Sequence, residues 1–345
     1  MTRSSALRRL VSVRTAGAAI GGALIAAAAL AGPAQAEEKI TFLTSWKAQA
    51  EHGGYYQAVA KGYFKKYGLD VSIREGGPGV DGGQLIAAGA VDFAMGSNND
   101  IALNLQKAGA DVVAVMAGMQ KIPQILMTHP GNGITSLADM KGKPILVSSS
   151  AINTYWVFLK AKYGFEDTQI RKYTFNIAPF LADKSAIQQG YLSSEPYFVK
   201  REAGFDPTVF LLADEGYLSY ASLTLVPAEW IKSKPAAVEG FVKASIEGWY
   251  DYLYGDPAPA NALIKADNPD MPDDVIAYGI AKMKEYGIVD GGDARKMGIG
   301  AMTDERWKTH FQMLVDAGIM PGDMDVSKAY TLDFINKGYG MKSGS

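Results

Sequence analysis

The feature that most constrains the fold is an alternation of short strands and helices over residues 40–99. Three short apolar segments predict strands: 40–44, 70–74 and 91–95. Two helical patterns separate them, at 55–67 and 84–88. Strands that alternate with helices form a mostly parallel sheet, and ligands bind beyond the carboxyl ends of its strands. The polar loops 45–54 and 96–100 follow two of these strands, so we expect a ligand site there.

Four pieces of this stretch are similar to a known family: Ser45-Trp46, His52-Gly53, the run 59–71 and the run 87–93. Together they resemble the NMT1/THI5-like solute-binding proteins. The resemblance is strongest over the first 60 or so residues after residue 36 and continues to about residue 260. It implies the periplasmic component of an ABC importer for thiamin pyrimidine precursors, with relatives that bind sulfonates, taurine and nitrate.

Residues 1–36 are expected to be a signal peptide. Four arginines and no acidic residue precede or flank an apolar, glycine-containing run at 16–31, and Ala34-Gln35-Ala36 is a small-x-small cleavage signal. The alternative is a membrane anchor, but the run is shorter than the roughly 20 residues that a bilayer needs. Arg8-Arg9 hints at twin-arginine export, although the following residues favour ordinary secretion. We therefore expect a periplasmic protein cleaved after Ala36.

The amino-acid composition excludes several kinds of site and argues against one class of binding partner. The chain contains no Cys, which excludes a lipid-modified cysteine, disulfides and thiolate metal sites. The formal charge of −2 becomes −6 once the four arginines before residue 37 are removed, and a mildly acidic surface argues against nucleic acid. We expect no cofactor and a monomer that delivers a small-molecule ligand to an inner-membrane ABC permease with its ATPase.

A chain of about 309 residues after cleavage is long enough for two lobes, because single cores stop growing at roughly 250–300 residues. We expect an α/β, two-lobed, type II-like periplasmic binding protein with a mostly parallel sheet in each lobe and a two-segment hinge. The first lobe should comprise 37–126 and 222–345, and the second 127–221. Pro123 favours an edge or crossover segment at 122–128, and 219–227 is the expected return crossing.

Secondary structure in the second lobe and beyond is predicted more coarsely. Strands are expected at 144–147, 172–175, 191–192 and 209–212, and helices at 136–140, 152–163, 185–189 and 197–203. The C-terminal part predicts four helices, at 235–254, 257–266, 272–286 and 303–317. Their Trp and Tyr side chains are expected in the core.

Enzyme motifs are not found. The three histidines have no i, i+4 spacing, and neither a Gly-x-Ser-x-Gly elbow nor a phosphate-binding Gly-rich loop is present. The family's fungal namesake is a thiamin pyrimidine synthase, and its branch carries a cysteine-rich iron motif. This chain has no Cys, so we expect a binding protein, with the synthase as the alternative of a different class.

The loop 45–54 offers Trp46, Gln49 and His52 as candidate ligand contacts. Trp46 presents a flat face for ring stacking. By resemblance, Gln49 occupies a place where pyrimidine-binding relatives carry an amide residue. The alternatives are a core plug for Trp46 and a loop brace for His52.

Ser97, Asn98, Ser149 and Ser150 precede predicted helices. Helix N-termini offer free N–H groups to carboxylate, sulfonate or phosphate oxygens, although ordinary capping would use the same residues. An alkanesulfonate, taurine or nitrate anchored there is the second ligand hypothesis.

Glu195 is the most specific single prediction of a ligand-binding residue. It lies in the segment 190–197, which resembles the family segment whose glutamate meets the aminopyrimidine edge of the ligand. An ionised carboxylate only accepts hydrogen bonds, which suits an amine and repels simple oxyanions. Tyr155 and Tyr191 are expected to wall the ring, with core packing as their alternative. A small nitrogen heterocycle is therefore the favoured ligand.

Overall fold

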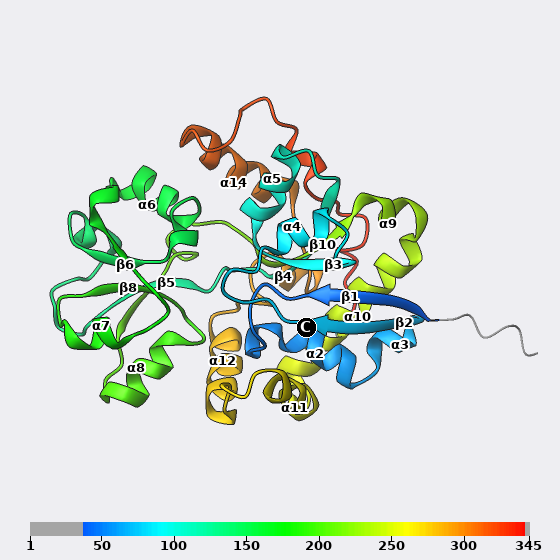
Figure 1. Cartoon of the computed structure of the whole chain (residues 1–345), viewed down its shortest axis with the longest axis horizontal. Helices are drawn as coiled ribbons and strands as arrows, with labels where there is room; N and C mark the ends of the chain where they lie inside the picture. The colour runs from blue at the N-terminus through cyan, green and yellow to red at the C-terminus, as the bar shows by residue number, and fades with distance from the viewer. Residues whose placement is uncertain (1–36, 342–345) are drawn as a thin grey trace, which may run out of the picture. The chain divides into compact units, whose positions relative to one another are not determined.

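The computed structural model describes residues 37–341. The predicted signal peptide at 1–36 lies outside the described residues. Within 37–341, two separate five-stranded sheets each carry helices on their faces (Figure 1). The predicted class, α/β with two lobes, is confirmed, but each sheet is mixed rather than mostly parallel, because one antiparallel strand inserts beside the parallel ones. We call the elements around the first sheet the first lobe and those around the second sheet the second lobe.

The first sheet has the strand order β2-β1-β3-β10-β4. β1 pairs in parallel with β2 and β3, whereas β10 is antiparallel to both β3 and β4. The predicted strands at 40–44, 70–74 and 91–95 correspond to the first three in the chain. The bounds are β1 Glu38–Leu43, β2 Leu69–Arg74, β3 Phe93–Asn98, β4 Val112–Met119 and β10 Ala221–Pro227.

The second sheet repeats this pattern in the order β7-β6-β8-β5-β9. β6 is parallel to β7 and β8, and β5 is antiparallel to β8 and β9. The bounds are β5 Gln124–Thr128, β6 Ile145–Val147, β7 Ile170–Lys172, β8 Ile187–Tyr191 and β9 Thr208–Leu211.

Two strands connect the lobes. β5 follows directly from the first lobe and becomes the antiparallel strand of the second sheet, while β10 returns and becomes the antiparallel strand of the first. Both predicted crossings are thus located, but each is an internal strand rather than an edge. Pro123 is compatible with this because it stands one residue before β5, where its missing N–H removes no bond of the ladder. The residue limits of the lobes remain a prediction.

Three predicted elements are wrong, and a fourth, the helix at 152–163, begins only at Tyr155. Residues 187–191 form β8 instead of a helix at 185–189, because pairing with β6 and β5 overrides a weak local preference. The strand predicted at 172–175 ends at Lys172. The helix predicted over 55–67 is interrupted at Gly62, which adopts a left-handed φ of 70°.

The helices have the following bounds: α2 Gly53–Ala60, α3 Tyr63–Lys66, α4 Gly82–Ala87, α5 Asn99–Lys107, α6 Tyr155–Tyr163, α7 Ala178–Ala182, α8 Glu195–Ala203, α9 Ala228–Ser233, α10 Pro235–Tyr254, α11 Ala258–Asp267, α12 Asp273–Glu285, α13 Ala294–Met297 and α14 Asp304–Asp316. Short 3₁₀ turns lie at η1 Ala50–His52, η2 Leu137–Met140, η3 Ser149–Ala151, η4 Asp167–Gln169 and η5 Val326–Lys328. No helix among residues 37–341 is both long and apolar enough to cross a membrane.

Close packing of α2 on α10 fixes the loop that precedes α2. A Cβ at Gly248 would lie 2.1 Å from the Gly54 carbonyl oxygen, so only glycine allows the two helices this approach. Trp249 and Tyr252 of α10 are fully buried, as predicted, and close over Gly53 and Gly54. The loop leading into α2 therefore rests on a rigid support.

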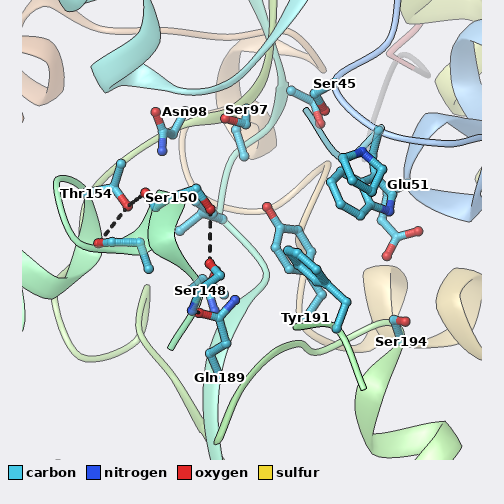
Figure 2. A pocket seen from close by; sticks show the side chains of 18 of the residues that line it. Ser45, Glu51, Ser97, Asn98, Ser148, Ser150, Thr154, Gln189, Tyr191 and Ser194 are labelled. Carbon is cyan, nitrogen blue, oxygen red and sulfur yellow. Dashed lines mark hydrogen bonds between the residues drawn. The ribbon is translucent and has the colours of Figure 1, made fainter. Parts of the chain in front are cut away.

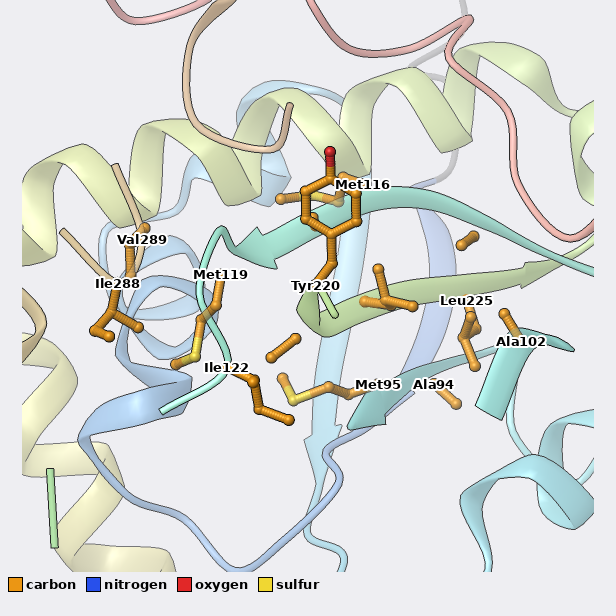
Figure 3. Close-up of a cluster of buried hydrophobic side chains, with 14 of the residues drawn as sticks. Ala94, Met95, Ala102, Met116, Met119, Ile122, Tyr220, Leu225, Ile288 and Val289 are labelled. Atoms are coloured by element: carbon orange, nitrogen blue, oxygen red, sulfur yellow. The ribbon is translucent and has the colours of Figure 1, made fainter. Parts of the chain in front are cut away.

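The apolar core of the first lobe continues towards the second. Met119 and Ile122, at the end of β4 and in the crossing to β5, are buried beside Met95 of β3 (Figure 3). Both also line the cavity described below. The core thus forms part of the cavity floor.

Candidate functional site

A cavity of about 590 Å³ lies between the two lobes and is lined by residues from both. This volume is in the range of small-molecule sites, roughly 300–1,000 Å³. Figure 2 shows side chains from both lobes converging on it. All ten residues predicted to bind the ligand line this one cavity: Trp46, Gln49, His52, Ser97, Asn98, Ser149, Ser150, Tyr155, Tyr191 and Glu195. Their role in binding remains a prediction.

Hydrogen bonds hold the first-lobe loop in shape. The Thr44 hydroxyl donates to the Trp46 carbonyl at 2.7 Å, and the Asn268 amide donates to the Ala48 carbonyl at 2.8 Å. Gly76 is required beside this loop, because a Cβ there would lie 2.4 Å from the Thr44 carbonyl oxygen. The backbone that carries Trp46 is therefore fixed before any ligand arrives.

The turn η1 places two titratable side chains deep in the wall. His52 is 1% exposed, and burial lowers its pKa to about 3, so its imidazole is neutral. Its Nδ1 has no hydrogen-bond partner among the described residues. Glu51 is 3% exposed and accepts a hydrogen bond from the Ser193 hydroxyl of the second lobe. Burial raises the pKa of Glu51.

Aromatic rings meet across the cavity. The Trp46 ring of the first lobe lies 5.1 Å from the Phe175 ring of the second, centroid to centroid, at an angle of 46°. Phe175 also packs on Tyr173, at 5.3 Å. Phe175 is 52% exposed and has a φ of 61°, which is unfavourable for a bulky side chain. Such strain tends to occur at ligand clamps.

Glu195 begins α8 and is held in one orientation. One carboxylate oxygen accepts the Tyr191 N–H at 2.7 Å, and the other accepts the Tyr173 hydroxyl at 3.2 Å. Burial raises the pKa of Glu195, the two hydrogen bonds lower it, and the nearby Glu51 raises it. Each carboxylate oxygen keeps capacity for a further donor.

Gln189 organises the second-lobe wall. Its side-chain oxygen accepts the Ser148 N–H at 2.6 Å and the Tyr155 hydroxyl at 2.8 Å. Burial raises the pKa of Tyr155 well above its usual value, so the phenol stays protonated. Tyr155 is therefore buried and held at the cavity wall, and its contact with a ligand ring stays a prediction.

The two serine loops differ from expectation. Asn98 is the N-cap residue of α5, but its side chain makes no capping bond and its oxygen is buried without a partner among the described residues. Ser149 and Ser150 belong to the short turn η3, and α6 begins only at Tyr155. These serines therefore do not stand at the N-terminus of α6, which corrects the predicted helix at 152–163.

Several lining residues were not predicted, notably Glu51, Tyr173, Phe175 and Gln189. Gln189 was missed because the segment was taken for a helix. Glu51 stands between Gln49 and His52 and could have been found as an acid that shares their loop. No signal in the sequence marks Phe175, since its left-handed conformation is unusual for phenylalanine.

Contacts already join the lobes around the cavity. The Glu51–Ser193 hydrogen bond and the Trp46–Phe175 ring contact lie at the cavity itself. Beside them, the Tyr197 hydroxyl of α8 donates to Asp274 of α12. The structure is therefore a closed arrangement in which both lobes touch.

Comparison with protein families finds a match to the NMT1/THI5-like model over residues 49–260. Among curated proteins, the riboflavin-binding protein RibY of Chloroflexus aurantiacus is 24% identical over 309 residues and covers 87% of each chain. The formylaminopyrimidine-binding protein of Halalkalibacterium halodurans is 25% identical over 236 residues, covering 67% of this chain and 71% of its own.

Enzymes also occur among the relatives. The Saccharomyces cerevisiae protein named 4-amino-5-hydroxymethyl-2-methylpyrimidine phosphate synthase THI11 is 29% identical over 240 residues, covering 65% of this chain and 69% of its own. Among solved structures, the periplasmic aliphatic sulphonate binding protein SsuA of Escherichia coli superposes with a TM-score of 0.65 at 17% identity. It covers 85% of this chain and 91% of its own. At this identity the likeness concerns the fold.

Proposed function

The chain belongs to the NMT1/THI5-like family, and on that premise we propose that it captures a small, flat nitrogen heterocycle between its lobes for an ABC importer. Its relatives include binding proteins, which supports a solute-binding role. In this proposal the protein works in the periplasm as a monomer and hands its ligand to an inner-membrane permease with its ATPase. The two segments that lead into β5 and β10 serve as the hinge, and closing brings the lobes together around the ligand.

The observation that carries the proposal is that Glu195 and the aromatic rings line the same cavity. Tyr191 and Tyr173 hold the carboxylate in place, and the Trp46 and Phe175 rings, which touch each other, line the same interlobe cavity. A planar ring packed against the cavity side of this aromatic pair would gain stacking contact, and its N–H groups would donate to Glu195. Gln49 and His52 line the same cavity and would add further polar contacts.

A sulfonate or nitrate ligand is less well supported. The described residues that line the cavity include Glu51 and Glu195 but no Lys or Arg. An anion would therefore meet two acids without a basic side chain to balance them. A synthase reaction is also less well supported, because the cysteine motif of the fungal branch has no counterpart in a chain without Cys.

A thermal-shift panel on the protein from residue 37 onward tests the proposal. The three ligand groups are 4-aminopyrimidine and related flat heterocycles, then taurine and alkanesulfonates, then pyridoxal phosphate. A ligand that binds only the folded state at a hundred times its Kd adds about 2.7 kcal/mol to the stability. We expect a rise in Tm with the first group alone. A rise with the second group alone would replace the proposed ligand class with an anion.

A further inference from the structure

We propose that the captured molecule is an organic cation, and that Glu51 shares with Glu195 the task of balancing its charge. This inference rests on the proposed function, since it names the charge of the molecule that the same cavity takes. It adds a residue that the sequence analysis did not select. A cavity that only accepted hydrogen bonds would bind a neutral ring equally well, whereas the proposed cavity prefers a cation.

The first observation is the charge of the cavity wall. Both carboxyl groups line the cavity, and among the described lining residues no Lys or Arg accompanies them. His52, the one lining imidazole, is kept neutral by burial. The cavity therefore contains two acids and no protein cation.

The second observation is how deeply Glu51 is placed. Its side chain is 3% exposed, and its hydrogen-bonding partner is the uncharged hydroxyl of Ser193. Buried carboxylates in proteins are paired with a positive charge or a metal, or else they become protonated. A cationic guest would supply the missing charge in the closed form, where the Ser193 bond already joins the two lobes.

The groups that face Glu51 from the surrounding elements do not supply that charge. Burial raises the pKa of Tyr252 of α10 and of Tyr191 of β8, and the nearby Glu51 raises both further, so both stay neutral. Glu195 of α8 is a second acid. Helix α12 packs on the turn η1 at Gly279, where a Cβ would lie 2.9 Å from the Ala50 Cβ.

The pH behaviour follows from burial. Burial raises the pKa of Glu51 above its ordinary value, and for Glu195 the nearby Glu51 acts in the same direction. A cation binds to the ionised carboxylates, so its binding releases protons wherever these groups are partly protonated. Its affinity should therefore rise with pH until both carboxylates are ionised.

Three flat probes of nearly equal shape test the charge directly: benzamidinium, benzamide and benzoate. Calorimetry at pH 5 and pH 8 is expected to give the order benzamidinium, then benzamide, then benzoate. The affinity for benzamidinium should be the higher at pH 8. Glu51→Gln keeps an oxygen for the Ser193 hydroxyl but removes the charge. It should weaken benzamidinium about tenfold or more at pH 8 and leave benzamide within about twofold.

Glu229→Gln is the matched control, because Glu229 is an exposed glutamate of α9 far from the cavity lining. It should leave the affinity for all three probes unchanged. A ligand-free measurement completes the test. A carboxyl whose pKa is raised by folding loses its stabilising contribution as pH rises, so the Tm of the natural protein should fall relative to Glu51→Gln between pH 5 and pH 8.

Two results would overturn the inference. One is a benzamide affinity equal to that for benzamidinium, which would leave the proposed function intact because a flat guest still binds. The other is a Tm difference between the natural protein and Glu51→Gln that stays constant from pH 5 to pH 8. If no flat molecule of any charge binds, including 4-aminopyrimidine, the proposed function itself fails.

Discussion

Replacing Glu195 with Gln removes one charge from the cavity while preserving its shape. In the structure, the Glu195 carboxylate accepts the Tyr191 N–H at 2.7 Å and the Tyr173 hydroxyl at 3.2 Å. A glutamine in the same rotamer keeps an oxygen for the Tyr191 N–H, and its amide can donate to the Tyr173 hydroxyl oxygen. We therefore expect Glu195→Gln to fold and to keep the cavity.

The expected loss in binding is worked from the bond that disappears. A hydrogen bond to a charged group contributes about 1.5–3 kcal/mol. At 1.4 kcal/mol for each factor of ten, the Kd of 4-aminopyrimidine should rise about 10- to 150-fold. Stability should move the other way, because the raised pKa of Glu195 means that ionisation at pH 8 costs the folded state free energy. The Tm of the variant at pH 8 should therefore equal or exceed that of the natural protein.

Isothermal titration calorimetry with 4-aminopyrimidine measures the first effect, and scanning calorimetry measures the second. Glu202→Gln is the control, since Glu202 is an exposed residue near the end of the same helix and does not line the cavity. A Kd for Glu195→Gln within twofold of the natural value, together with a native Tm, would show that Glu195 does not contact the ligand. A loss of Tm would instead show that the carboxylate mainly holds α8 in place.

Three further predictions concern the cavity wall, the helix packing that supports it and a contact between the lobes. Phe175→Gly relieves a left-handed backbone that costs a non-glycine residue about 1–2 kcal/mol, so it should be more stable than Phe175→Ala by that amount in urea unfolding. Both variants should bind a flat heterocycle more weakly, by about 0.5–1.5 kcal/mol for the lost ring contact, and equal Tm values for Gly and Ala would contradict the strain. Gly248→Ala places a Cβ 2.1 Å from the Gly54 carbonyl oxygen and should destabilise the protein by about 1–3 kcal/mol, with denaturant midpoints as the measurement. Ser193→Ala removes the hydrogen bond to Glu51 that joins the lobes; small-angle scattering of the ligand-free protein should show a larger radius of gyration, and an unchanged radius would assign closure to other contacts.

Much of the fold could be predicted where the local pattern and the final environment agree. The helix at 235–254 has the predicted limits, because its apolar stripe is continuous and a proline begins it. The strands at 40–44 and 70–74 also correspond to β1 and β2 within two residues at each end. These two strands pair with each other in parallel. Their local sequence pattern and their pairing in the sheet therefore both favour a strand.

The predictions are wrong where contacts with residues distant in the sequence determine the secondary structure. Gln188 and Gln189 lie in the middle of β8, where polar side chains are buried, and the local sequence gave no reason to expect a strand. Gln189 is tolerated there because its oxygen accepts two hydrogen bonds from Ser148 and Tyr155, which arrive from another strand end and another helix. No single segment contains that information.

In the candidate site, too, some residues could be predicted from local sequence, whereas others depend on contacts between distant segments. Ten residues at one cavity could be predicted, partly because strand ends in such sheets converge and partly, for Gln49 and Glu195, from the family resemblance. The sequence analysis did not select Glu51 or Phe175, because their roles depend on contacts between the lobes. Glu51 meets Ser193, and Phe175 meets Trp46, only when the two sheets face each other.

The exchange of strands between the sheets also determines how the chain can be assembled. β10 lies between β3 and β4, although about a hundred residues separate it from β4 along the chain. The position between β3 and β4 in the first sheet therefore stays vacant until the whole second lobe has been synthesised. A fragment ending before residue 221 would expose two unpaired strand edges in the middle of a sheet, which favours aggregation. The strands of the second sheet, β5 to β9, are contiguous in the chain, so the second lobe can pair all its strands before the first lobe receives β10.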